Sequence, residues 1–169
     1  MSIAETVKEK NGVMVQLVTF TIDNEEYAVN IADVIEIIRL PKVQPLPKSP
    51  DFMKGIINLR GTVVPIVDIR TRFNLQSVND NALKRTIIVK VDEQKIGMIV
   101  DSVSKVIRIN SDEIKEPPQF TSVIGSEYIE GVIMLQERMI ILLNVNRIFS
   151  KEEIRDLSRA SEHINHENG

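Results

Sequence analysis

Cysteine and tryptophan are absent from the 169-residue chain, and aromatic residues make up only 4% of it. Without cysteine the protein has neither disulfides nor thiolate chemistry, which fits a reducing compartment such as the cytosol. No apolar run approaches the roughly 20 residues that a membrane-spanning helix needs, and no signal-peptide pattern opens the sequence. We therefore expect a cytoplasmic protein that reaches a membrane only through other proteins.

Basic residues are neither in excess nor clustered along the sequence. The chain has 21 Lys and Arg against 24 Asp and Glu, for a formal net charge of −3. A nucleic-acid surface needs a concentrated basic field, and binding of single strands also uses stacking aromatic side chains. A β-barrel that binds oligonucleotide or a small ligand is therefore the weaker functional alternative.

The usual carriers of catalysis and metal binding are also missing. The two histidines, His163 and His166, lie close to the C-terminus, and no Gly-rich phosphate-binding loop is present. Nucleophilic triads and zinc sites therefore lack obvious members. Asp68 and Asp101 could be combined as an acid–base pair, but we favour the interpretation that each ends a strand and bonds backbone or a nearby cation. We expect no enzymatic activity, no metal and no cofactor.

The most informative stretch is GIINLRGTVVPIVDIRTRF, residues 55–73. Two apolar runs flank a short break at which Gly61 is free to adopt positive φ, which predicts a β-hairpin. The permanently charged side chain of Arg60 is expected to point outward from this rigid turn. Because proline cannot donate to a strand ladder, we expect the returning strand to be exposed at Pro65.

This hairpin pattern occurs twice. At an offset of 76 residues, Gly55 matches Gly131, Asp68 matches Asn144 and Phe73 matches Phe149. At an offset of 69 residues, an earlier pair of segments also matches, residues 20–23 with 89–92 and Val34 with Val103. Two matching segments in the same order indicate an internal duplication.

Further short strands are predicted on both sides of the hairpin by β-branched and alternating patterns. Residues 13–22, 27–29, 85–91, 96–100 and 103–109 fit strands, and residues 31–38 fit a turn of helix that runs into a strand. Prolines make residues 41–49 an extended linker, and Ser49 followed by Pro50 predicts one helical turn up to Lys54. The capping-box pattern of Ser150 and Glu153 opens a C-terminal helix.

These elements favour an all-β fold of two small barrels with short helical turns. We divide the chain into a flexible tail (1–12), a two-lobe domain (13–149), a C-terminal helix (150–161) and a polar tail (162–169). The lobes are placed at about 13–80 and 81–149, although duplicated β-domains can exchange a strand. Because a barrel of roughly 65 residues buries too little surface to be stable alone, we expect an apolar interface and a groove between the lobes.

Several motifs resemble the CheW family of bacterial chemotaxis coupling proteins. The most specific is the hairpin GIINLRG followed by VVPIVDIR, over residues 55–61 and 63–70. The segments EYAVNI (26–31), VIEI (34–37) and IVDSV (99–103) resemble the same family. The resemblance covers about residues 15–149, which is nearly the whole chain.

The resemblance implies two SH3-like five-stranded barrels, in agreement with the all-β prediction. It also implies a function that composition and spacing do not supply. Such a protein has no catalytic activity and joins the regulatory domain of the histidine kinase CheA to the cytoplasmic tips of chemoreceptors. We expect it to be monomeric when free and to assemble with these partners into receptor arrays.

By the same resemblance, nine residues become candidates for partner binding. Val34, Glu36 and Ile37 would lie on a surface for kinase or receptor contact. Arg60, in the N-L-R-G turn, would serve receptor coupling, and Asn58 of the same turn would be a partner-binding residue. Val103 would help to form a receptor groove between the lobes. Lys115, Gln119 and Phe120 would lie in a loop of the second lobe that meets another face of the kinase.

Purely structural interpretations of these residues stay open. Val34 and Ile37 are equally compatible with the core, Arg60 with a solvated turn, and Phe120 with a plug in its own lobe. Glu36 differs, because a lone charge in an apolar strand must face water or a partner. A further alternative is the CheW-like part of a larger signalling protein, but Met1 and its own polar tail favour a separate adaptor.

Overall fold

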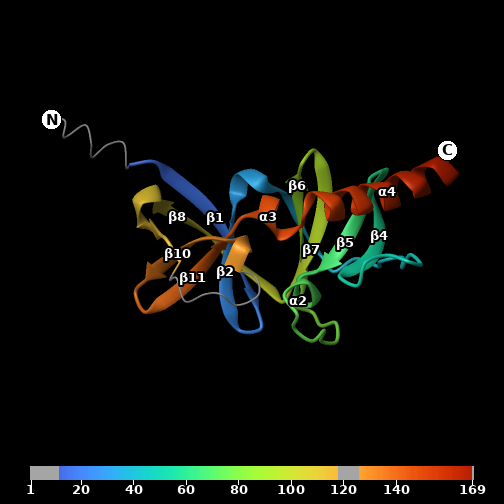
Figure 1. Cartoon of the computed structure of the whole chain (residues 1–169). Helices are drawn as coiled ribbons and strands as arrows, with labels where there is room; N and C mark the ends of the chain where they lie inside the picture. The colour runs from blue at the N-terminus through green and yellow to red at the C-terminus, as the bar shows by residue number, and fades with distance from the viewer. Residues whose placement is uncertain (1–11, 118–125, 169) are drawn as a thin grey trace.

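The computed structural model describes residues 12–117 and 126–168, with side chains described up to residue 159. Strands dominate this part of the chain and form two sheets that lie side by side (Figure 1). The six-stranded lobe contains β1 (Met14–Ile22), β2 (Glu25–Asn30), β8 (Ser102–Asn110), β9 (Ile114–Lys115), β10 (Ile129–Leu135) and β11 (Arg138–Leu143). The five-stranded lobe contains β3 (Val34–Arg39), β4 (Met53–Leu59), β5 (Thr62–Asp68), β6 (Arg85–Val91) and β7 (Gln94–Val100). The prediction of an all-β fold with two small lobes is confirmed.

The helical elements are short, except at the C-terminus. The short ones are η1 (Ile31–Asp33), α2 (Ile69–Arg72), η2 (Ser111–Glu113), η3 (Ser126–Tyr128) and α3 (Val145–Ile148). The helix α4 (Lys151–Asn168) follows and packs on β5 of the five-stranded lobe (Figure 1). Its capping box is formed by Ser150 and Glu153, whose side chains accept each other's backbone N–H at 3.0 and 2.7 Å.

The two sequence repeats exchange their first hairpins. The sheet order is β8-β1-β2-β11-β10-β9 in one lobe and β3-β6-β7-β5-β4 in the other. The hairpin β1–β2 thus joins the strands of the second repeat, and β6–β7 joins those of the first. The register follows the duplication, since the parallel pair Ile66 and Gly97 has its counterpart in Leu142 and Ala28. A lobe boundary near residue 80 therefore divides the sequence repeats but not the lobes in space.

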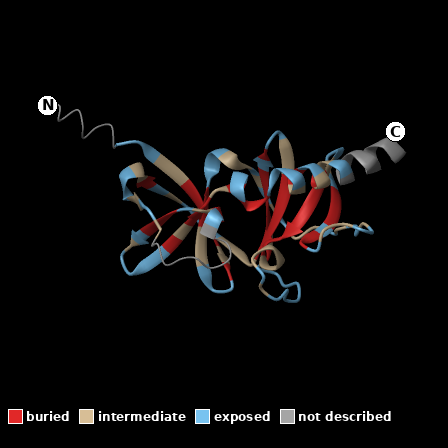
Figure 2. Cartoon of the chain, in the orientation of Figure 1, coloured by how far each residue is buried: buried red, intermediate tan, exposed pale blue. Residues whose placement is uncertain are grey.

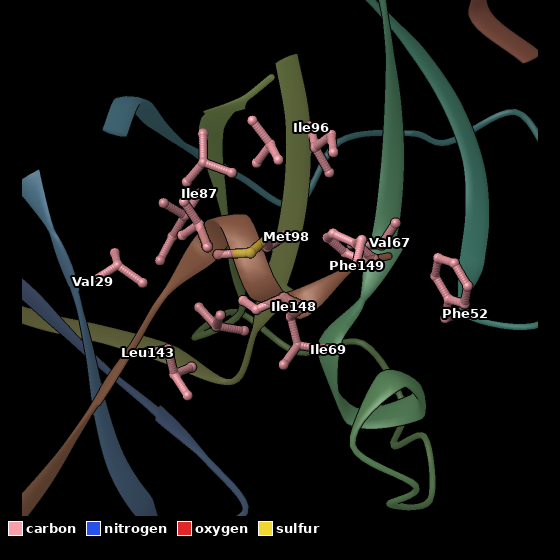
Figure 3. Packing of buried hydrophobic residues seen from close by; sticks show 14 of the residues in the cluster. Val29, Phe52, Val67, Ile69, Ile87, Ile96, Met98, Leu143, Ile148 and Phe149 are labelled. Carbon is pink, nitrogen blue, oxygen red and sulfur yellow. The ribbon is translucent and has the colours of Figure 1, made fainter. Parts of the chain in front are cut away.

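The largest apolar cluster lies where the two lobes meet. Side chains from both lobes and from the connecting helix α3 point toward one another there (Figure 3). The labelled members include Val29 and Leu143 from one lobe and Ile87 and Met98 from the other, together with Ile148 of α3. Each barrel has only a smaller cluster of its own. Figure 2 shows buried segments at this junction and also along the strands of the five-stranded lobe. A shared core between the lobes is expected when each is too small to be stable separately.

Three local predictions are wrong. No helical turn forms before Lys54: a backbone turn from Met53 N–H to Pro50 O (3.0 Å) leads directly into β4, which places Phe52 and Met53 in the core. Pro65 is buried rather than exposed. It lies just before the segment in which β5 pairs with β7, so its missing N–H interrupts no pairing with that strand.

The third concerns the C-terminus. The expected polar tail over residues 162–169 is helical as far as Asn168, because α4 continues beyond residue 161. In its first turns, Ile154 and Leu157 are buried in the large cluster.

Candidate partner-binding surface

The β4–β5 hairpin holds Arg60 at its tip. Arg60 and Gly61 form the two-residue turn and both have positive φ, 51° and 89°, the combination that matches the twist of a β-hairpin. The side chain of Asn58 accepts a hydrogen bond from Gly61 N–H at 2.7 Å and so fixes the turn. The Arg60 side chain is 70% exposed. The predicted hairpin and the outward direction of this arginine agree with the structure.

Arg60 forms an ion pair with Glu36 of β3. The two residues are far apart in sequence, and the guanidinium Nη2 donates to the carboxylate Oε2 across the opening between the hairpin tip and β3. The Glu36 side chain is half-buried. Glu36 and Arg60, which were predicted separately as contact residues, are therefore bound to each other. No pattern in the sequence indicated this pairing.

The strand β3 alternates between its two faces. Val34, Glu36 and Ile38 are half-buried, whereas Ile35 and Ile37 are exposed at 41% and 39%. Val34 packs against the large cluster, so its structural interpretation is supported, but Ile37 is not a core residue. The exposed Ile35 was not among the predicted contacts. The two-residue period of a β-strand places Ile35 on the same face as Ile37, so this period is the sequence signal that could have identified it.

The remaining predicted residues lie on the six-stranded lobe or outside the described part. Val103 is half-buried on β8, where it is paired with Phe20 and packs against the large cluster. Lys115 on β9 is exposed, and its ammonium donates to Asp112 O at 3.1 Å. Gln119 and Phe120 lie outside the described residues. The predicted set thus covers two areas, of which the Glu36–Arg60 area is the better defined.

Asp68 and Asp101 do not form an acid–base pair. Asp68 accepts from Arg70 N–H at 3.0 Å and from the Ser77 hydroxyl at 3.0 Å. Asp101 accepts from Arg70 Nε and Nη2 at 2.9 and 2.7 Å and from Asp23 N–H at 2.8 Å. Burial alone would raise the pKa of Asp101, but these hydrogen bonds outweigh it and hold the pKa below its ordinary value. Each carboxylate bonds backbone or a cation, as interpreted from the sequence.

Two further searches bear on the chemistry of the molecule. Among the described residues, no group of three or more His, Cys, Asp or Glu side chains is placed to hold a metal ion. In the same part of the chain, none of the helices combines the length and apolar character required to span a bilayer.

Comparison with known proteins places this geometry in a family. The family model described as the CheW-like domain matches residues 16–153. The chain belongs to the CheW-like family. It is similar to the chemotaxis protein CheW of Treponema pallidum, with 34% identity over 88% of this chain and 89% of that protein. It is also similar to the chemotaxis protein CheW of Klebsiella aerogenes, with 36% identity over 82% of this chain and 84% of that protein.

A solved CheW structure supports the same assignment. The crystal structure of the scaffolding protein TtCheW from Thermoanaerobacter tengcongensis has a TM-score of 0.76 and 33% identity, and the match covers 83% of this chain and 96% of that one. The family assignment and the SH3-like double-barrel architecture expected from the sequence are thereby confirmed.

Proposed function

We propose that this CheW-like protein is a non-enzymatic chemotaxis adaptor that binds the regulatory domain of the histidine kinase CheA and the cytoplasmic tips of chemoreceptors. Membership of a family whose relatives are named chemotaxis proteins, one of them titled a scaffolding protein, supports this role. Among the described acidic residues, the two that suggested catalysis are occupied by structural hydrogen bonds. A partner-binding role therefore fits the chemistry better than an enzymatic one.

The observation that carries the proposal is the Glu36–Arg60 pair beside the exposed isoleucines of β3. An exposed guanidinium on a rigid hairpin can exchange its carboxylate partner for one on a receptor, at little cost to the fold. Ile35 and Ile37 provide apolar area on the neighbouring strand for a kinase contact. The same lobe can thus contact two partners with different chemistry.

Signal transfer follows from the simultaneous binding of both partners. An adaptor without switch chemistry of its own can control a kinase only by setting the relative positions of its partners. Moderate affinities suffice when several contacts act together, because linked binding raises the effective concentration. In this proposal the protein is cytoplasmic and monomeric when free. Val103 and Lys115 of the six-stranded lobe provide further contacts, as do Gln119 and Phe120.

The test is a charge reversal at the hairpin tip. Arg60→Glu should weaken co-sedimentation with receptor arrays by about tenfold, the effect of losing one well-formed charged contact. Binding of the isolated kinase regulatory domain and the thermal midpoint should change little, because the side chain is exposed.

Arg138→Glu is the matched control. Arg138 lies at the start of β11, directly after the turn of the equivalent hairpin, and pairs with Glu26 at 2.8 and 3.0 Å. This variant should leave receptor binding unchanged. Equal losses in both variants, or none with Arg60→Glu, would contradict the assignment of Arg60 to receptor coupling.

A further inference from the structure

A second charged area lies at the other end of β3. Arg39 and Arg85 are directly opposite each other on β3 and β6, on the face that also carries Ile37. Like charges in directly opposite positions of neighbouring strands repel each other. Within the described part of the chain, neither arginine has a carboxylate partner. Arg85 is held in place because its Nη1 donates to the carbonyls of Ala82 and Lys84, both at 2.8 Å.

The internal duplication provides a direct comparison. The position of Arg39 corresponds to Arg108 in the other lobe, and that of Arg85 corresponds to Gln16. Arg108 and Gln16 are likewise paired, on β8 and β1. There, the amide oxygen of Gln16 accepts from Arg108 Nε and Nη2 at 2.9 and 3.2 Å, with the amide oriented to present its oxygen. In the six-stranded lobe the arginine therefore has a hydrogen-bond acceptor directly opposite it, whereas in the five-stranded lobe Arg39 has a second arginine opposite it.

More positive charge lies next to the Arg39–Arg85 pair. Leu40, which follows Arg39, lines a hollow together with Lys42 and Lys54. Asp80 is the carboxylate of this hollow, and it lies 3.6 Å from the Nζ of Lys84. Cations thus outnumber carboxylates here. The two arginines meet across β3 and β6, and the two lysines meet in the hollow that begins one residue after Arg39.

We propose that the Arg39–Arg85 pair binds an acidic segment of a protein partner, and that Lys42 and Lys54, in the hollow that begins at Leu40, add to the positive charge that attracts it. The planar guanidinium groups match carboxylates, and two of them side by side suit a segment with closely spaced acidic residues. The neighbouring Ile37 adds apolar area that a protein segment can cover and a small anion cannot. The inference does not depend on the identity of the kinase or receptor partners.

Another like-charged pair shows how the chain neutralises such repulsion elsewhere. Lys90 and Lys95 are also directly opposite each other, on β6 and β7, but Glu93 lies 3.5 Å from the Lys90 ammonium. This pair shares a strand with Arg85 and has its own carboxylate. It therefore serves as the internal control for a purely general attraction between acidic peptides and basic residues.

The experiment is an NMR titration of the full chain with an acetylated hexaglutamate peptide at low ionic strength. The Arg39 and Arg85 side-chain N–H signals and the amides of β3 and β6 are expected to shift. The variant Arg85→Gln copies the Arg–Gln arrangement of the other lobe, so it should fold normally. We expect it to weaken peptide binding about five- to tenfold, as for one charge-assisted contact, whereas Lys90→Gln should not.

Four outcomes would overturn the proposal. The first is equal loss of peptide binding in Arg85→Gln and Lys90→Gln, which would indicate general attraction. The second is inorganic phosphate binding to the same signals as tightly as the peptide, which would indicate a small-anion site. The third is tighter binding of a single-stranded oligothymidylate, which would indicate a nucleic-acid surface. Retained peptide affinity in Arg85→Gln, with an unchanged thermal midpoint, would equally reject it.

Discussion

The unit formed by β4, β5 and α2 can be compared with its repeat, formed by β10, β11 and α3. Both have a register shift at the bulge glycine, Gly55 in one and Gly131 in the other. In both, the residue at the end of the hairpin donates its N–H to the carbonyl of an equivalent aromatic residue before the hairpin. Asp68 N–H donates to Phe52 O at 2.8 Å, and Asn144 N–H donates to Tyr128 O at 2.9 Å. The duplication has thus preserved the bulge and the hydrogen bond that closes each hairpin.

The two units differ in the charges on their short helices. Arg70 and Arg72 of α2 correspond to Asn146 and Ile148 of α3. Arg70 pairs with Asp101 at the crossover between the lobes and lies 3.4 Å from Asp23 in the β1–β2 turn. Among the residues that the structure describes, the ion pairs that join the lobes therefore involve α2 and not its counterpart α3. The two copies thus share a fold but differ in the ion pairs that they contribute between the lobes.

Arg72, the other arginine of α2, links this short helix to α4. Its guanidinium donates to both carboxylate oxygens of Glu153 at 2.8 and 2.9 Å, and its Nε donates to Ile148 O at 2.8 Å. It also lies over the rings of Phe52, Tyr128 and Phe149, at 5.1 to 5.6 Å from their centroids. A single arginine thus anchors the start of α4 to the five-stranded lobe, and the corresponding Ile148 is simply buried.

Alanine substitutions at the bulge glycines test how far the two units are equivalent. We expect the largest loss of stability at Gly55. A Cβ on Gly55 would lie 2.1 Å from the backbone oxygen of Gln44, and its φ of 149° is unfavourable for other residues. Gly55→Ala should therefore lower the free energy of unfolding by about 3 kcal/mol or more. At Gly131 a Cβ would lie 2.4 Å from the γ2 methyl of Ile114 and 3.0 Å from the backbone oxygen of Lys115, so the nearest backbone atom is farther away than at Gly55, and the φ of Gly131 does not disfavour other residues.

For this reason Gly131→Ala should be the milder change, by about 1 kcal/mol or more. Urea denaturation of both variants at pH 7 measures the difference. The same loss in both, or a greater loss at Gly131, would mean that the two bulges are under the same backbone constraint.

The second prediction concerns the ion pair that only one unit has. The pKa of Asp101 is lower in the folded protein than its ordinary value, so the carboxylate stabilises the fold above its unfolded-state pKa of about 4. This stabilisation is lost as the pH falls toward the folded-state pKa. Asp101→Asn should therefore reduce stability at pH 7 by about 2 kcal/mol, the effect of breaking a charge-assisted hydrogen-bond pair.

The same variant should flatten the acid limb of the stability curve, because it removes a group that titrates there. Glu93→Gln, at a side chain that is 90% exposed and faces the exposed Lys90, is the control and should leave the stability at pH 7 nearly unchanged. If Asp101→Asn kept the full pH dependence of the parent between about pH 5 and pH 3, the Arg70–Asp101 pair would not couple protonation to folding.

Much of the fold follows from the sequence because its signals are local. The Gly61 turn, the alternation in the strands and the Ser150 capping box each depend on a few neighbouring residues. The wrong predictions have a different cause. Pro50 and Pro65 were judged by what proline does in isolated elements, whereas tertiary packing of Phe52 and the late start of the pairing between β5 and β7 decided their surroundings.

The candidate site was less accessible to sequence reasoning. Residue identities and family resemblance indicated Glu36 and Arg60, but their pairing depends on how the hairpin tip lies against β3. The exchange of the first hairpins, and with it the meeting of Arg39 and Arg85, depends on which repeat supplies each strand. A duplication read from one chain permits either arrangement, so the sequence alone could not decide between them.

The smallest effect on stability is expected at the Glu36–Arg60 pair. Glu36→Gln removes the charge but keeps the shape, and the exposed Arg60 can be solvated instead, so the loss should be about 0.5 kcal/mol or less. Glu26→Gln, which disrupts the pair with Arg138 in the other lobe, is the matched control, and it too should leave the denaturation midpoint almost unchanged. A loss above about 2 kcal/mol for Glu36→Gln would mean that the pair closes the barrel and is not free to exchange partners. The comparison of the two hairpins would then change, because the tip of β4–β5 would be a structural joint rather than a surface held ready for binding.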